Sequence, residues 1–404
     1  MEHATTQQSA LFEAFKKAAN VLANPWLSFL LATVGLLLLL RFRRYAFNWY
    51  AGGLVLLVQA VVVAWGMKDT NFRLIVGKPD NVPIAAMLFV STFVLWLAMA
   101  QAINNERRAE QKLPPDEKET SAQKTWVWPD LLYIEFVALI ICSVVLILWA
   151  IYLRAPLEQP ANPAETPNPS KAPWYFLGLQ EMLVYYDPWY AGVVLPTIII
   201  IGLMAIPYID VNPKGNGYYT YSERKVAIAT FLFGYLALWV FMIITGTFLR
   251  GPGWNFFGPF EYWDPHKVVA LNNVNLSDYV WVELFPWIYR KTGIAWFYQG
   301  LPDVPNVVPH LIPPDWSSIG SFMRALGLAC KKEFAGLLFL AFYFLALPGI
   351  LSKTLLKKFY EQMDFVRYSI FVLLLLTMFT LPLKMVLRWT INLKYFVDTP
   401  WIKF

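Results

Sequence analysis

The stretch Lys-Ala-Pro-Trp-Tyr-Phe-Leu-Gly-Leu-Gln-Glu at residues 171–181 carries more information than any other part of the chain. It lies between two long apolar segments, and therefore at one edge of a membrane. Proline is favourable in the first turn of a helix, so Pro173 predicts a short amphipathic helix over 173–185. Trp174 and Tyr175, at its start, offer flat apolar surfaces that each carry one polar atom.

Apolar segments of membrane-spanning length recur along the whole chain. Hydrophobic residues make up 58% of the 404 residues and charged residues 15%, a balance typical of membrane proteins. A bilayer core of about 30 Å requires about 20 apolar residues per helix. The segments that meet this requirement are 25–42, 50–67, 84–103, 131–153, 190–209, 226–249, 334–352 and 368–387. The sequence therefore predicts an all-α polytopic membrane protein with eight transmembrane helices.

Basic residues gather at alternate ends of these segments. Cations favour the cytoplasmic ends of membrane helices, and eight alternating spans put all the clusters on that one side. The loops 154–189 and 250–333, and both termini, then lie on the positive side. This pattern explains the net charge of +6 without nucleic acid as a partner. The clusters are Arg41, Arg43 and Arg44; Arg107, Arg108, Lys112 and Lys118; Arg224 and Lys225; and Lys353, Lys357, Lys358 and Arg367.

Composition divides the chain into five parts. The charged linker contains a proline pair and is predicted to be a flexible tether on the cytoplasmic side. The aromatic-rich part is either an ordered cap on the membrane surface or a docking platform for a redox partner. An amphipathic surface helix, rather than a cleavable signal peptide, is expected over 8–22. The parts are a three-helix membrane extension (1–104), the charged linker (105–127), a central domain (128–249), the aromatic-rich segment (250–333) and two C-terminal transmembrane helices (334–404).

Three features in consecutive order resemble cytochrome b. Residues 171–181 are similar to the Pro-Glu-Trp-Tyr motif that lines its quinol-oxidation pocket, with Pro173 in the place of the motif's Glu. Residues 128–136, Trp-Pro-Asp-Leu-Leu-Tyr-Ile-Glu-Phe, resemble the start of the first helix of subunit IV of the cytochrome b6f complex. Residues 155–169 resemble the loop that precedes the motif in that subunit. The resemblance covers about residues 124–250 and identifies the C-terminal half of a split cytochrome b.

The resemblance implies a function and a set of partners. The chain is expected to form the quinol pocket of a bc- or b6f-like quinol:cytochrome c oxidoreductase in the bacterial cytoplasmic membrane, with no activity alone. Quinol oxidation would release protons on the positive side. The implied partners are a haem-bearing N-terminal half of cytochrome b, a Rieske iron–sulfur protein and c-type cytochromes. The proline at position 173 suggests menaquinone as the quinone.

The haems are expected to belong to the partners. Cytochrome b binds its haems through paired histidines on membrane helices. His3, His266 and His310 all lie outside the predicted spans, so this chain alone holds neither haem b nor haem c. His266 is either a surface histidine or a ligand of another group. Cys142 and Cys330 belong to no haem-attachment or iron–sulfur pattern, and no metal site is predicted.

Several residues are predicted to serve the quinol pocket. By resemblance, the pocket contains Pro173, Trp174, Tyr175, Phe176 and Gln180. Proline cannot accept the protons that quinol oxidation releases, so a nearby base is needed. Glu181, seven residues after Trp174 and expected at the water boundary, is the predicted catalytic acceptor, with Gln180 and Asp187 as alternatives.

Two acidic residues lie at the opposite membrane face, at the start of the fourth span. By resemblance, Asp130 lies near a quinone-reduction site, although the same residue type also caps helices. Glu135 lies one turn into the span, where a carboxylate is costly unless it is paired or functional. It contacts a haem or quinone of the partner, or it extends to interfacial water.

Two other functions are compatible with a polytopic chain. One is a quinone-binding membrane anchor of a different respiratory oxidoreductase. The other is a transporter subunit, which predicts several mid-span charges and broken helices. Only Glu135 and Lys384, both near span edges, meet that description, so the resemblance to cytochrome b decides the prediction.

Overall fold

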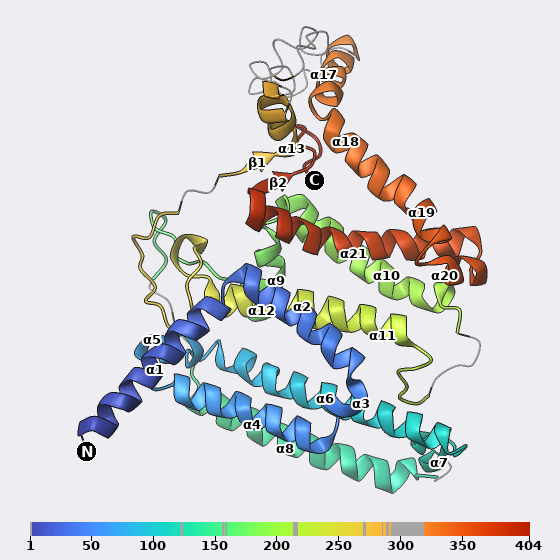
Figure 1. The fold of residues 1–404 in the computed structure, drawn as a ribbon. Helices are drawn as coiled ribbons and strands as arrows, with labels where there is room; N and C mark the ends of the chain where they lie inside the picture. Colours follow the sequence, from blue (N-terminus) through green and yellow to red (C-terminus); the bar gives the residue numbers. More distant parts are fainter. Residues whose placement is uncertain are drawn as a thin grey trace. The chain divides into compact units, whose positions relative to one another are not determined.

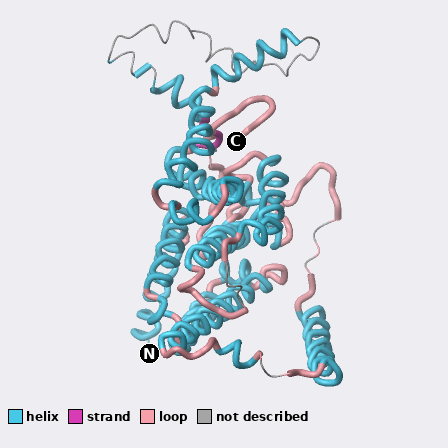
Figure 2. The backbone as a smooth tube through the Cα atoms, turned by 90° about the vertical axis from the view of Figure 1, so that its right-hand side faces the viewer, coloured by secondary structure: helices cyan, strands magenta, loops and turns pink. Residues whose placement is uncertain are grey.

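The computed structural model describes residues 2–121, 124–155, 157, 160–212, 217–269, 272–284, 286–287, 291 and 319–404. Helices dominate this part of the chain, and one pair of short strands accompanies them (Figures 1 and 2). The chain divides into two compact units. Unit 1 consists of Met1–Gly178 and Lys214–Val269, and unit 2 of Leu179–Pro213 and Ala270–Phe404.

Within the described residues, seven helices are long and apolar enough to cross a membrane. The count is eight if Ala10–Leu22 and Pro25–Arg41, which meet at an angle of 83°, form one further span. The predicted all-α polytopic membrane protein is therefore confirmed. The seven are Trp49–Gly66, Val82–Glu110, Val127–Tyr152, Tyr190–Ile209, Lys225–Leu249, Phe334–Lys353 and Phe365–Ile391.

Unit 1 holds the N-terminal extension together with part of the central domain. Its elements are α1 (Glu2–Leu22), α2 (Pro25–Arg41), α3 (Arg43–Ala46), α4 (Trp49–Gly66), α5 (Thr70–Val76), α6 (Val82–Glu110), α7 (Asp116–Thr120), η1 (Val127–Leu131), α8 (Leu132–Tyr152), the first half of α9 (Trp174–Met182), α11 (Lys225–Leu232), η3 (Phe233–Val240), α12 (Phe241–Ile244), η4 (Thr245–Leu249) and η5 (Pro252–Trp254).

Helices α4 and α6 of the extension pack side by side (Figure 1). The close approach occurs at Gly52, where an added Cβ would collide with the ring of Trp96. Trp96 is buried, and its indole N–H donates a hydrogen bond to the Ala46 carbonyl at 3.2 Å. The ring of Phe47 lies 4.8 Å from that of Trp96. These contacts hold the turn between α3 and α4 against α6.

Gly52→Val should therefore destabilise the extension, because overpacking a tight contact costs about 1–3 kcal/mol. Gly53→Val is the matched control, since a Cβ at Gly53 meets nothing within 4 Å. Thermal unfolding of the detergent-solubilised protein is the measurement. Equal midpoints for the two variants would show that the helices do not approach each other at Gly52.

A buried carboxylate, Glu106 near the end of α6, joins three segments of unit 1. It lies 3.2 Å from Arg43 and 3.8 Å from Arg44, and it accepts a hydrogen bond from the Ser222 backbone N–H at 3.0 Å. The Arg43 guanidinium also lies 4.5 Å from the ring centre of Tyr221. Helix α3, the end of α6 and the segment before α11 are thus brought together. Three of the predicted basic clusters lie at this same end.

Glu106→Gln should destabilise the protein strongly. Removing one partner of a buried ion pair costs about 3–5 kcal/mol, because the remaining charge stays buried. Glu110→Gln is the control: Glu110 also pairs with Arg44, but its side chain is 57% exposed, against 4% for Glu106. An exposed pair contributes at most about 1 kcal/mol. Chemical or thermal unfolding of both variants checks the difference, and equal losses would contradict it.

The charged linker is more ordered than its composition predicts. Over 105–127, the first residues continue α6 and a later stretch forms α7. The Asn105 amide donates hydrogen bonds to the Glu117 carboxylate at 2.7 Å and to the Tyr219 carbonyl at 2.8 Å. Arg108 donates to the Pro114 carbonyl. Up to α7, the expected flexible tether is instead folded onto α6, because its charged and amide groups find specific partners.

At the other end of unit 1, Phe260 anchors the start of the aromatic-rich segment. Its ring lies 5.6 Å from that of Phe15 and 5.0 Å from that of Phe72. The Asn20 side chain accepts a hydrogen bond from the Phe260 N–H at 3.0 Å, and Asn71 donates to the Phe260 carbonyl at 3.4 Å. This part of the segment is therefore packed on α1 and α5.

The helix Val127–Tyr152 differs from the other spans in one respect. None of its residues is buried against the described chain. Nearly all its side chains are apolar, so lipid or another protein must cover every face of this helix in the membrane.

Unit 2 holds the second half of the motif helix and the C-terminal spans. Its elements are η2 (Tyr190–Val194), α10 (Leu195–Ile209), β1 (Val274–Asn275), α13 (Leu276–Asp278), η6 (Tyr279–Leu284), α17 (Ile319–Lys332), α18 (Phe334–Ala341), η8 (Phe342–Ala346), α19 (Leu347–Lys353), α20 (Lys357–Gln362), α21 (Phe365–Ile391) and β2 (Leu393–Tyr395). Helices α10 and α21 pack side by side, and β1 pairs with β2 in parallel.

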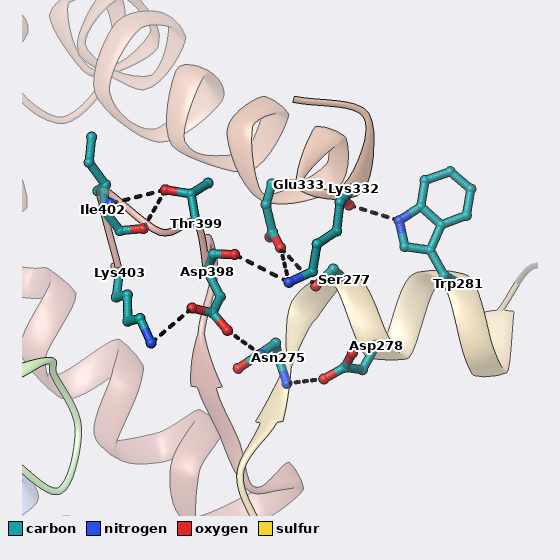
Figure 3. Close-up of polar contacts among 10 residues, drawn as sticks. All are labelled: Asn275, Ser277, Asp278, Trp281, Lys332, Glu333, Asp398, Thr399, Ile402 and Lys403. Carbon is teal, nitrogen blue, oxygen red and sulfur yellow. Dashed lines mark hydrogen bonds and ion pairs between the residues drawn. The ribbon is translucent and has the colours of Figure 1, made fainter. Parts of the chain in front are cut away.

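A buried polar cluster ties the strand pair to the start of α18 (Figure 3). Lys332 Nζ lies 3.1 Å from the Glu333 carboxylate and donates a hydrogen bond to the Asp398 carbonyl at 3.2 Å. The Ser277 hydroxyl donates to Glu333 at 3.1 Å, and the Trp281 indole N–H donates to the Lys332 carbonyl. Burial raises the pKa of the Glu333 carboxyl, and Lys332 opposes this shift. The cluster joins α13, α17, α18 and the segment after β2.

Candidate functional site

The motif helix α9 begins at Trp174, directly after Pro173, and ends at Met182. The prediction of a helix that begins at the proline is therefore right to within a residue, although the helix ends before the predicted residue 185. Pro173 accepts a hydrogen bond from the Phe176 N–H at 2.8 Å. The chain then continues through a turn in which the Tyr186 N–H donates to the Met182 carbonyl at 2.9 Å.

Small residues let α9 approach the span Lys225–Leu249 closely. A Cβ at Gly178 would lie 3.3 Å from the ring of Trp239, which is tighter than ordinary packing. A Cβ at Gly246 would lie 3.4 Å from the Leu177 carbonyl oxygen. Leu177 itself is buried. The orientation of the motif is thus set by this span, whose small residues leave room for the helix.

Three large aromatic side chains at the start of α9 are exposed. Trp174 is 40% exposed, Tyr175 52% and Phe176 52%. The ring centres of Trp174 and Tyr175 lie 5.8 Å apart, and those of Tyr175 and Phe176 4.8 Å apart. Water is an unfavourable environment for so much apolar surface, so this cluster is suited to bind an apolar ligand or partner. Gln180, further along the helix, is half-buried.

Glu181 is buried, with 1% of its surface exposed. The Tyr185 hydroxyl donates a hydrogen bond to its carboxylate at 3.4 Å. The expectation that this side chain lies at the water boundary is wrong for this chain, because α9 directs it into the interior of unit 2. The alternative acceptor Asp187 is half-buried and accepts a hydrogen bond from the Trp189 N–H at 3.2 Å.

A second buried charge lies close to the turn that follows α9. Lys384 of α21 is 1% exposed, and its Nζ has no hydrogen-bond partner among the described residues. The ammonium instead lies 4.4 Å from the ring centre of Tyr186 and 5.0 Å from that of Phe404. The Tyr186 hydroxyl is 2.6 Å from that of Thr380, and burial raises the pKa of Tyr186. Cation–π contact replaces the missing hydrogen bonds of the lysine.

A cavity of about 1200 Å³ lies beside the motif in unit 1. One wall is the loop between α5 and α6 in the N-terminal extension, and the other is the loop that leads into α9. The buried side chains of Ile84 and Leu177 contribute apolar surface. The complete lining is Lys78, Asp80, Asn81, Pro83, Ile84, Pro160, Ala161, Asn162, Glu165, Thr166, Pro167, Asn168, Pro169, Lys171, Ala172, Pro173, Trp174, Leu177 and Trp263.

Two contacts hold the second wall in position. The Asn168 side chain accepts a hydrogen bond from the Gly253 N–H at 2.6 Å. Lys171 donates a hydrogen bond to the Thr247 carbonyl at 2.7 Å, and its ammonium lies 4.5 Å from a ring centre of Trp263. The loop is therefore fastened both to the end of the span Lys225–Leu249 and to the turn that follows it.

One comparison with known proteins decides the family of this region. Residues 160–249 match the model of the family described as Cytochrome b(C-terminal)/b6/petD. This stretch, called the cytochrome b segment below, is therefore similar to the C-terminal part of cytochrome b. No solved structure matches the chain.

The cytochrome b segment confirms the predicted relationship to a cytochrome b6/subunit IV-like family. It contains the loop 160–173, the motif helix α9 and two spans. Similarity to that family supports the expectation of a subunit of a cytochrome bc- or b6f-type complex. Among the described residues, no group of three or more His, Cys, Asp and Glu side chains is arranged to hold a metal ion. His310 lies outside the described residues.

The two negative-side candidates precede the cytochrome b segment. Asp130 lies inside the π-helical turn η1 and caps no helix, because no side chain accepts a hydrogen bond at the N-cap of η1 or α8. The capping interpretation of Asp130 is therefore wrong. Glu135 lies in the first turn of α8, and both side chains are exposed. Their predicted place beside a quinone or haem stays a prediction.

Sequence reasoning missed three features of this region. No sequence motif indicates that the extension contributes to the cavity, because the two walls are about 80 residues apart in the chain. The only sequence signal for Glu165 is its position just before the motif at residues 171–181. The burial of Lys384 was detectable only as a lysine within an apolar segment.

Proposed function

We propose that this chain is the quinol-pocket-forming subunit of a bacterial bc- or b6f-like quinol:cytochrome c oxidoreductase. The observation that carries the proposal is the exposed aromatic cluster Trp174–Tyr175–Phe176 at the start of α9, beside a cavity and within the cytochrome b segment. Flat apolar rings suit a quinone headgroup, and two of the three, Trp174 and Tyr175, each add one polar atom. Ligand sites combine such surfaces with a few polar groups. Pro173 and Gln180 complete the proposed pocket.

The proposed complex supplies the redox centres that this chain lacks. In that complex the two electrons of the quinol would be divided between a haem-bearing N-terminal half of cytochrome b and a Rieske iron–sulfur protein. A c-type cytochrome then takes the electron from the iron–sulfur protein. Menaquinol is the proposed substrate, and the bacterial cytoplasmic membrane the proposed location. The uncovered helix Val127–Tyr152 supports a membrane partner, because its apolar faces bury nothing within the described chain.

Proton release requires acceptors near the quinol. Glu181 is the proposed acceptor of one proton, and its carboxylate is linked to the Tyr185 hydroxyl. Asp130 and Glu135 are proposed to lie near a quinone or haem of the partner at the opposite membrane face. A quinone-binding anchor of another oxidoreductase remains the second candidate, and the same exposed cluster of aromatic side chains is the observation that favours it.

Tyr175→Ala should lower quinol:cytochrome c turnover of the purified complex about tenfold. A lost aromatic contact costs about 0.5–1.5 kcal/mol, and 1.36 kcal/mol corresponds to a tenfold change in rate. Tyr262→Ala is the control, since Tyr262 is an exposed tyrosine outside the motif helix α9. Haem content of both variants reports assembly. Normal turnover and normal inhibitor sensitivity in Tyr175→Ala would remove Tyr175 from the pocket.

The chain expressed without partners should show no b-type haem spectrum, since no histidine lies in a span. Co-expression with a four-histidine membrane cytochrome should restore a spectrum that co-purifies with this chain. A stoichiometric haem spectrum from the lone polypeptide would contradict the split-subunit proposal.

A further inference from the structure

The cavity beside Trp174 contains a carboxylate that the sequence motif does not predict. Glu165 lines it together with Pro173 and Trp174. The turn Asn162–Glu165 presents this side chain: the Ala164 N–H donates to the Asn162 side chain at 3.0 Å, and the Glu165 N–H donates to the Asn162 carbonyl at 3.2 Å. The Glu165 side chain is exposed and has no ion pair or hydrogen bond with the described residues.

We propose that a quinol headgroup binds in this cavity, between Trp174 and residues 78–84 of the extension, and that Glu165 accepts one of its protons. The proposal rests on the proposed function of the chain as a quinol-pocket subunit. It assigns to the N-terminal extension a direct part in the pocket, which the cytochrome b segment does not form alone.

The dimensions and lining of the cavity suit this ligand. Small-molecule pockets measure about 300–1,000 Å³, so about 1200 Å³ admits a quinol headgroup together with water. Trp174 and Trp263 offer ring surfaces, and Ile84 and Leu177 provide an apolar lining. A general base must come within about 3 Å of the proton that it accepts, and an unpaired side chain on the cavity wall is free to do so.

The other charged groups of the cavity leave Glu165 available. Lys78 and Asp80 neutralise each other, with their Nζ and carboxylate oxygen 3.0 Å apart. Lys171 is held at the Thr247 carbonyl and over Trp263. Of the two carboxylates that face the cavity, Asp80 is therefore paired and Glu165 is not.

The proton and electron balance is complete. Oxidation of a quinol to a quinone breaks two O–H bonds and releases two protons and two electrons. Glu165 forms a new O–H bond with one proton and passes it to water on the positive side. The second proton leaves through another acceptor of the complex. The two electrons go singly to the iron–sulfur centre and the haem b of the partner subunits.

The test uses the complete complex purified with its partner subunits and a short-chain menaquinol analogue. Glu165→Gln keeps the volume and removes the base, so kcat should fall by about 10²-fold or more, within the range of general-base catalysis. KM should change little, and the limb of the pH profile that reports an acidic base should disappear. Glu261→Gln, which alters an exposed carboxylate outside the cavity, should leave turnover unchanged.

Wild-type turnover and pH profile in an assembled Glu165→Gln complex would overturn the proposal. If that variant does not assemble, Glu165→Asp is measured instead: a fall of tenfold or more supports the role, and normal turnover overturns it. A different result would contradict the proposed function itself: a wild-type complex that neither oxidises nor binds the quinol analogue. A wild-type complex that oxidises quinol alongside an unaffected Glu165→Gln complex refutes only the assignment of Glu165.

Discussion

Unit 1 depends on the burial of one charge. Glu106 sits at the end of a long apolar helix, where a carboxylate is stable only if cations and N–H groups surround it. Arg43 and Arg44 come from the extension, and the Ser222 N–H comes from the cytochrome b segment. This requirement fixes the extension to the segment at one end, and the aromatic contacts of Phe260 fix the aromatic-rich segment to the extension at the other.

The cavity beside the motif follows from this attachment. One wall of the cavity lies in the cytochrome b segment. The other lies in the N-terminal extension, outside the residues that match the family. The helices of the extension fix the position of residues 78–84 beside Trp174. The extension therefore contributes one wall of the cavity beside Trp174.

The sequence was sufficient to predict those features that depend on apolar periodicity and on local motifs. Apolar length predicted the spans, and the motif predicted the helix that begins after Pro173. Contacts between distant segments leave no such pattern. Nothing local indicates that Glu181 points into unit 2, that Lys384 finds aromatic rings, or that Glu165 shares a cavity with residues of the extension. The charged linker has the composition of a disordered segment, because the partners that order it, such as Tyr219 for Asn105, lie far along the chain.

The uncovered helix Val127–Tyr152 distinguishes unassembled copies of the protein from assembled ones. A newly inserted copy exposes an entire apolar helix to lipid, whereas a copy with a partner on this helix does not. Surplus and assembled copies then differ by a surface that membrane proteases and insertion factors can distinguish.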